Sequence, residues 1–200
     1  MKNTFSNSLD TDKSILLLID YQRGMFNGVE SGDRTLLKNN IIALAKGAKI
    51  MEVPTVLSSI GENRNGVFFP EITELYPDNR VIARNLPCFD ALQEPEVESA
   101  VKNIGRQQLV LTGLWTSMCF AHTALHALRS GYDVFGVIDT AGSESKQAHD
   151  IAVQRMIQAG VVPLTWEQTV AEWMKDWSNP KAGQLTKEVY SVHNGYMGMH

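Results

Sequence analysis

The sequence is poor in cysteine, in long apolar runs and in clustered positive charge. Its two cysteines, Cys88 and Cys119, are too few for a disulfide framework, so we expect free thiols in a reducing compartment. No apolar run approaches the roughly 18–20 residues that a membrane span needs. Residues 1–13 are polar and lack the apolar core of a secretory signal. These absences predict a cytoplasmic protein that has no membrane partner.

The charge balance argues against nucleic acid as a partner. The net charge is −4, and lysines and arginines form no cluster. With 44% apolar and 20% charged residues, the 200-residue chain suits one globular domain over residues 1–200. We place its core at about 14–178. The less regular tail, 179–200, is expected to pack at an interface of a homo-oligomer.

Short aliphatic runs alternate with helical patterns along the chain. The expected strands are 14–20, 54–59, 81–84, 109–111, 132–139 and 161–164. The expected helices are 36–51 with Asp33 as its cap, 94–103, 120–129, 147–158 and one starting at 165. Residues 21–26 and 61–70 are expected to be loops. This alternation predicts an α/β fold, a single-domain open parallel six-stranded sheet with helices on both faces (Rossmann-like, three layers).

The stretch 109–119 ends in a cysteine that is well placed for chemistry. Gly113 ends the strand, and Thr116 or Ser117 is expected to cap the helix that follows. Cys119 then falls in the first helical turn, where free N–H groups and the helix dipole favour a low-pKa thiolate. The pattern therefore predicts a nucleophile at the carboxyl end of the sheet.

Two more strand ends carry a reactive group, Asp20 and Arg84. Because the carboxyl ends of parallel strands share one edge, these residues and Cys119 can converge. A carboxylate can take the thiol proton and return it to a leaving group, while a cation stabilises both anions. Backbone N–H groups around 114–119 are expected to cradle the oxyanion.

Each of these residues also has a plain structural interpretation. Asp20 could be a helix cap or a salt-bridge partner, Arg84 a structural cation, and Cys119 a small buried apolar residue. Cys88 is interpreted as a packing residue or pocket wall. A further set of residues is expected to line a substrate pocket: Gln22, Phe26, Phe68, Trp115 and Thr116. For Gln22 the alternative is that it merely braces its loop.

Four segments resemble the isochorismatase-like cysteine hydrolase superfamily. They are 17–22 (LLIDYQ), 81–84 (VIAR) followed by Phe89-Asp90, 112–119 (TGLWTSMC) and 131–142 (GYDVFGVIDTAG), spanning roughly 14–165. The arginine at 84 and the tail through Trp166, Asp176 and Trp177 are most similar to its YcaC-like subgroup.

The resemblance implies an isochorismatase-like three-layer α/β/α fold, a catalytic triad of Asp20, Arg84 and Cys119, and no cofactor. It also implies a non-proline cis peptide between Leu114 and Trp115, which directs the Trp115 amide toward the oxyanion. The Cys119 amide is the second group expected to bind the oxyanion. Octamers are common in the subgroup, so an octamer is the expected homo-oligomer.

Two departures from the family pattern restrict the functions that we expect of this chain. Arg84 stands where many relatives carry lysine; because arginine does not exchange a proton near neutral pH, its expected role is purely electrostatic. Nicotinamidase-type members bind a metal through an aspartate and histidines in the loop after the second strand. Here residues 61–65 read GENRN, without histidine, so no catalytic metal is expected.

The leading hypothesis is a cysteine hydrolase that acts on a small-molecule substrate with an amide-like or related carbonyl group. A catalytically idle oligomeric or redox-sensing protein on the same fold is the first alternative, because a reactive cysteine can also form a sulfenic acid. A nicotinamidase-type amidase is the second.

Overall fold

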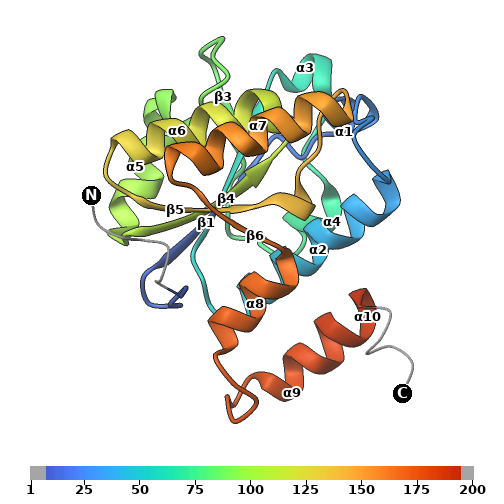
Figure 1. The fold of residues 1–200 in the computed structure, drawn as a ribbon, viewed down its shortest axis with the longest axis vertical. Helices are drawn as coiled ribbons and strands as arrows, with labels where there is room; N and C mark the ends of the chain where they lie inside the picture. Colours follow the sequence, from blue (N-terminus) through green and yellow to red (C-terminus); the bar gives the residue numbers. More distant parts are fainter. Residues whose placement is uncertain (1–7, 195–200) are drawn as a thin grey trace.

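A computed structural model describes residues 8–194 and contains one sheet in the order β3-β2-β1-β4-β5-β6 (Figure 1). All five pairings are parallel. The strands are β1 (Ser14–Ile19), β2 (Thr55–Ile60), β3 (Ile82–Arg84), β4 (Gln108–Gly113), β5 (Asp133–Val137) and β6 (Val162–Leu164). The predicted single-domain, six-stranded parallel sheet is confirmed.

The two central strands, β1 and β4, are buried along their whole length. Helices cover both faces of a parallel sheet, so its inner strands contact no water and read as unbroken aliphatic runs. The strand order reverses between β1 and β4. In open α/β sheets the crevice beyond such a reversal is where ligands bind, and the chain leaves β1 at Asp20 and β4 at Leu114.

Helices form one layer on each side of the sheet (Figure 1). One layer contains α5 (Pro95–Ile104), α6 (Ala121–Arg129) and α7 (Lys146–Ala159). The other contains α2 (Arg34–Ile50), α8 (Trp166–Met174), α9 (Ala182–Leu185) and α10 (Ser191–His193). Asp33 caps α2 as predicted, because its Oδ1 accepts hydrogen bonds from the N–H groups of Thr35 and Leu36.

Several local expectations were wrong, each over a short segment. The loops predicted at 21–26 and 61–70 contain α1 (Arg23–Asn27), α3 (Glu62–Asn65) and the start of α4 (Pro70–Thr73). The fifth strand ends at Val137, and Ile138–Thr140 is a 3₁₀ turn. Helices of one turn are too short to show a 3.6-residue apolar period, so sequence patterns miss them.

The tail is more regular than expected as far as it is described. After α9 the chain continues through a π-helical turn (Thr186–Tyr190) into α10, and Leu185, Val189 and Tyr190 are buried. Residues 195–200 of the predicted interface tail lie outside the described residues. Trp177, just before this tail, is 64% exposed.

No helix between residues 8 and 194 is long and apolar enough to cross a bilayer.

Gly113 of β4 lies opposite Ile19 of β1. A Cβ there would lie 2.6 Å from both the Cβ and the carbonyl oxygen of Ile19. We expect Gly113→Ala to lower the free energy of unfolding by about 1–3 kcal/mol, measured by urea denaturation at a fixed protein concentration. Gly183→Ala is the control, because a Cβ at Gly183 meets nothing within 4 Å and the residue is helical. Equal losses in the two variants would contradict the packing argument.

Candidate active site

Asp20 leaves β1 in a left-handed backbone conformation, with φ of 58°. This region is uncommon for residues other than glycine, although aspartate tolerates it. Backbone hydrogen bonds hold it in place: the Asp20 N–H donates to the Ser58 carbonyl (2.8 Å), and the Gln22 N–H donates to the Asp20 carbonyl (2.7 Å). The turn fixes the carboxyl group beyond the end of β1.

Arg84 ends β3 and reaches across β2 to Asp20. Its Nη1 donates to Asp20 Oδ1 (2.9 Å) and its Nη2 to Asp20 Oδ2 (2.8 Å), a bidentate ion pair in which neither side chain is exposed. Nη1 also donates to the Ser58 hydroxyl (3.1 Å). Arg84 Nε is buried and has no hydrogen-bond partner among residues 8–194.

Cys119 completes the cluster from the other side of the strand-order reversal. Its Sγ lies 3.5 Å from Arg84 Nη2, the nitrogen that also donates to Asp20 Oδ2. The three strand-end residues selected from the sequence therefore meet at the Arg84 guanidinium. Burial raises the pKa of Asp20, and the positive charge of Arg84 opposes that effect.

The expected low pKa of Cys119 was wrong in direction. Burial, and then the negative charge of Asp20, raise the pKa of the thiol above its ordinary value, although Arg84 acts in the opposite sense. Only 3% of the residue is exposed. The resting state of Cys119 is therefore a thiol, and a thiol needs a base to remove its proton before the sulfur can act as a nucleophile.

The expected capping role of Thr116 or Ser117 was also wrong. The residues Thr116–Phe120 form a π-helical turn that runs into α6, and no side chain caps it. Thr116 Oγ1 lies 2.9 Å from His149 Nδ1, and the Ser117 hydroxyl donates to Glu144 (3.0 Å). The Thr116 hydroxyl ties the Thr116–Phe120 turn to α7, and the Ser117 hydroxyl ties it to the segment that leads into α7.

Most backbone amides near the nucleophile are already donated within the protein. The acceptors are Ile19 O for Leu114, Gly142 O for Thr116, Ser143 Oγ for Ser117, and Trp115 O for both Met118 and Phe120. These five amides are unavailable to an oxyanion. The bond between Leu114 and Trp115 is cis, as the family resemblance implied.

The residues predicted to line a pocket are distributed around the turn after β1. Gln22 is fully buried, donates from Nε2 to the Gly66 carbonyl (2.6 Å) and accepts from the Ile60 N–H (2.9 Å), contacts that favour its bracing role. Trp115 is half-buried and donates from Nε1 to the Met25 carbonyl (2.8 Å). Phe26 is also half-buried, whereas Phe68 and Thr116 are buried. Their contact with substrate stays a prediction.

Cys88 lies outside the triad. Its Sγ donates to the Asp90 carbonyl (3.3 Å), and partial burial raises the pKa of its thiol. Between residues 8 and 194, no three or more histidine, cysteine or acidic side chains are grouped so that they could hold a metal ion.

Two residues in contact with the site were not identified from the sequence. Ser58 bonds Arg84, and His149 bonds Thr116. For Ser58 a signal existed, because the pair Ser58-Ser59 interrupts an otherwise apolar strand. For His149 there was none, because its partner is 33 residues away along the chain.

Residues 14–168 match the family model of the isochorismatase domain. The chain belongs to the isochorismatase family. The probable hydrolase YcaC of Escherichia coli strain K12 is 35% identical over 188 residues, which are 92% of this chain and 88% of that protein.

Solved structures of YcaC proteins have the same fold. The E. coli YcaC structure, described as an octameric hydrolase of unknown specificity, matches with a TM-score of 0.91 and 34% identity over 96% of this chain and 93% of that one. YcaC from Pseudomonas aeruginosa, with hexane-2,5-diol and covalent acrylamide, matches with a TM-score of 0.90 and 31% identity over 96% and 95%.

The raised pKa of Cys119 can be tested by alkylation with iodoacetamide in a Cys88→Ala background. We expect the rate to rise about tenfold per pH unit without a plateau below about pH 9, because only the thiolate reacts. Removing the neighbouring negative charge in Asp20→Asn should lower the pKa and raise the rate at pH 7.5 by about tenfold or more. A wild-type plateau below pH 8 would show that the thiolate is already stable in the ground state.

Proposed function

We propose that this isochorismatase-family protein is a metal-independent cysteine hydrolase acting on a small amide-like or related carbonyl substrate. The proposal rests on one observation: Cys119 Sγ lies 3.5 Å from the same guanidinium nitrogen that donates to Asp20 at 2.8 Å. Arg84 therefore contacts both the nucleophile and the base, and its fixed charge can stabilise either one as an anion. The triad roles of Asp20, Arg84 and Cys119 are part of the proposal.

Acylation begins when the thiol of Cys119 loses its proton. Asp20 takes the proton from Cys119 Sγ while the sulfur forms a bond to the substrate carbonyl carbon, and the π electrons move to the carbonyl oxygen. The raised pKa of Asp20 favours this transfer, since it makes the carboxylate a stronger base. We assign the oxyanion to the amides of Trp115 and Cys119, because the other amides of this stretch have protein acceptors.

The oxyanion then collapses. The carbon–oxygen double bond re-forms, the bond to the leaving nitrogen or oxygen breaks, and Asp20 gives its proton to that atom, leaving an acyl thioester on Cys119. In deacylation Asp20 takes a proton from water as the water oxygen attacks the thioester. Collapse breaks the carbon–sulfur bond, releases the acid and returns the proton to the sulfur. Arg84 keeps its charge throughout.

The relatives support this chemistry at a coarse level. YcaC of E. coli is a probable hydrolase, and YcaC of P. aeruginosa has been solved with covalent acrylamide. Acrylamide is an electrophile that thiolates attack, so a covalent adduct on a relative 31% identical to this chain is consistent with a reactive nucleophile. Neither description gives a natural substrate.

A panel of small amides and esters tests the proposal. We expect Cys119→Ala to abolish turnover and Asp20→Asn to lower kcat by about 10²–10⁴-fold, because it cannot accept the thiol proton. Cys88→Ala is the matched control and should keep wild-type rates. Acid-quenched reactions should show an acyl adduct on Cys119 by mass spectrometry.

The alternatives give different outcomes. Turnover that survives in Cys119→Ala would contradict the nucleophile assignment. Absence of Cys119-dependent turnover together with reversible oxidation by peroxide would favour a redox sensor. Deamidation of nicotinamide that requires added metal would favour a nicotinamidase-type enzyme.

We also propose that the protein is a homo-oligomer, an octamer as described for YcaC of E. coli. Large apolar side chains such as Trp177 and Val192 are 64% and 60% exposed in the single chain, as expected of side chains that another subunit covers. Multi-angle light scattering should give a mass several times the 22.2 kDa of one chain. Trp177→Lys should reduce that mass; a wild-type mass of one chain would contradict the proposal.

A further inference from the structure

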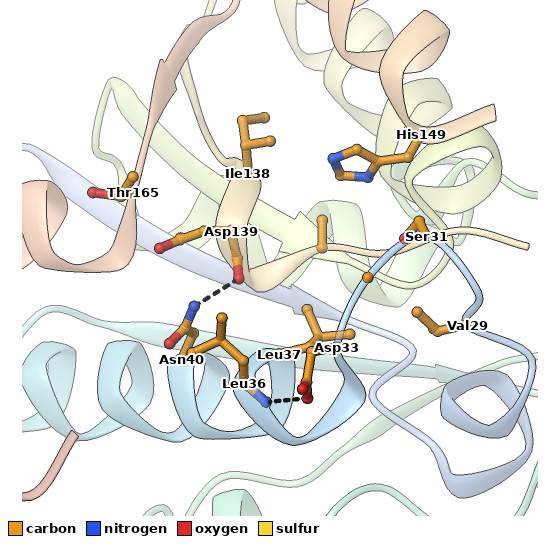
Figure 2. Close-up of a pocket in the computed structure, with 12 residues that line it drawn as sticks. Val29, Ser31, Asp33, Leu36, Leu37, Asn40, Ile138, Asp139, His149 and Thr165 are labelled. Carbon is orange, nitrogen blue, oxygen red and sulfur yellow. Dashed lines mark hydrogen bonds between the residues drawn. The ribbon is translucent and has the colours of Figure 1, made fainter. Parts of the chain in front are cut away.

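A cavity of about 320 Å³ lies at the carboxyl edge of the sheet, beyond β5 (Figure 2). In Figure 2 the His149 ring and the Ile138 side chain lie on its upper side, and Leu36, Leu37 and Asp33 of the α2 start lie below. Its volume is within the range of small-molecule sites. None of the triad residues lines it.

The cavity adjoins the Thr116–Phe120 turn through His149. The His149 ring lines the cavity, and its Nδ1 lies 2.9 Å from Thr116 Oγ1. Burial lowers the pKa of His149, so the ring is neutral above neutral pH and its Nε2 is the ring atom left to face a ligand.

The polar groups of the cavity are negative or neutral. Asp33 and Asp139 contribute carboxyl groups, and within the described part of the chain no lysine or arginine lines the cavity. Asp139 Oδ1 accepts one hydrogen bond, from the Trp166 N–H (2.8 Å). Burial raises the pKa of Asp139 to about 6, so this carboxylate is ionised at pH 8.

The remaining surface of the cavity is apolar. Val29 and Leu37 are buried, and Ile138 and Ala141 contribute further aliphatic surface. Leu36, which is 59% exposed, forms the rim. The Asp33 carboxylate accepts the N–H groups of Thr35 and Leu36 as the cap of α2, which leaves Asp139 as the carboxylate available to a ligand. Apolar walls beside the Asp139 carboxylate suit a ligand that has a positive end and a short hydrocarbon body.

We propose that this cavity binds a small organic cation of the primary alkylammonium class. The ammonium group donates hydrogen bonds to the Asp139 carboxylate, and the alkyl chain packs on Leu36, Leu37 and Ile138. The site is distinct from the triad, so the proposal does not depend on the hydrolase activity.

Isothermal titration calorimetry of the full chain with n-butylammonium at pH 8 tests the proposal. We expect saturable binding with Kd on the order of 1 mM or tighter for this small ligand. n-Butanol and butyrate should each bind at least about tenfold more weakly, because a charge-assisted hydrogen bond is lost or becomes repulsive. Asp139→Asn should weaken n-butylammonium binding to a similar degree.

A second pair of variants tests the binding proposal if Asp139→Asn disturbs the fold. Leu36→Arg places a cation at the rim and should abolish n-butylammonium binding, whereas Ile157→Arg, at a position 38% exposed near the end of α7 and outside the cavity, should leave it unchanged. Absence of saturable heat up to about 50 mM ligand, far above the expected Kd, would overturn the proposal. Equal affinity for n-butanol or butyrate, or undiminished binding to Leu36→Arg, would overturn it too.

Discussion

The buried ion pair between Asp20 and Arg84 is the interaction on which the candidate site depends. Neither side chain is exposed, and either charge alone would be strongly unfavourable in this position, so each requires the other. The pair joins the ends of β1 and β3 across β2, and Ser58 of β2 bonds the guanidinium from between them. Cys119 follows β4 and contacts the guanidinium of this pair. The pKa of its thiol therefore depends on the charges of Asp20 and Arg84.

The fold places these groups at the ends of strands of one sheet. β1 and β4 are neighbours at the reversal of strand order, and Gly113 lets them approach without a side chain in the way. Gly142 and Ser143 of the β5–α7 connection and His149 of α7 then bond the Thr116–Phe120 turn. The same connection lines the cavity beyond β5, so one segment contributes both to the candidate site and to that cavity.

Local patterns in the sequence predicted most of the fold and the three residues that meet at the candidate site. Aliphatic runs marked β1 and β4, and the charged residues that end β1 and β3 pointed to Asp20 and Arg84. The pKa of Cys119 could not be predicted, because it depends on burial and on the charge of a residue 99 positions away. The hydroxyl groups of Thr116 and Ser117 were assigned to a helix cap because sequence spacing cannot distinguish an α-helical start from a π-helical turn.

The central claim is that Asp20 is ionised beside Arg84 in the resting protein and is therefore able to accept the proton of Cys119. Infrared difference spectroscopy between the wild type and Asp20→Asn at pH 7 isolates the vibration of this one carboxyl group. The account predicts that the substitution removes the bands of an ionised carboxylate. Loss of the carbonyl band of a protonated carboxylic acid would contradict it, because a neutral Asp20 could not act as the base.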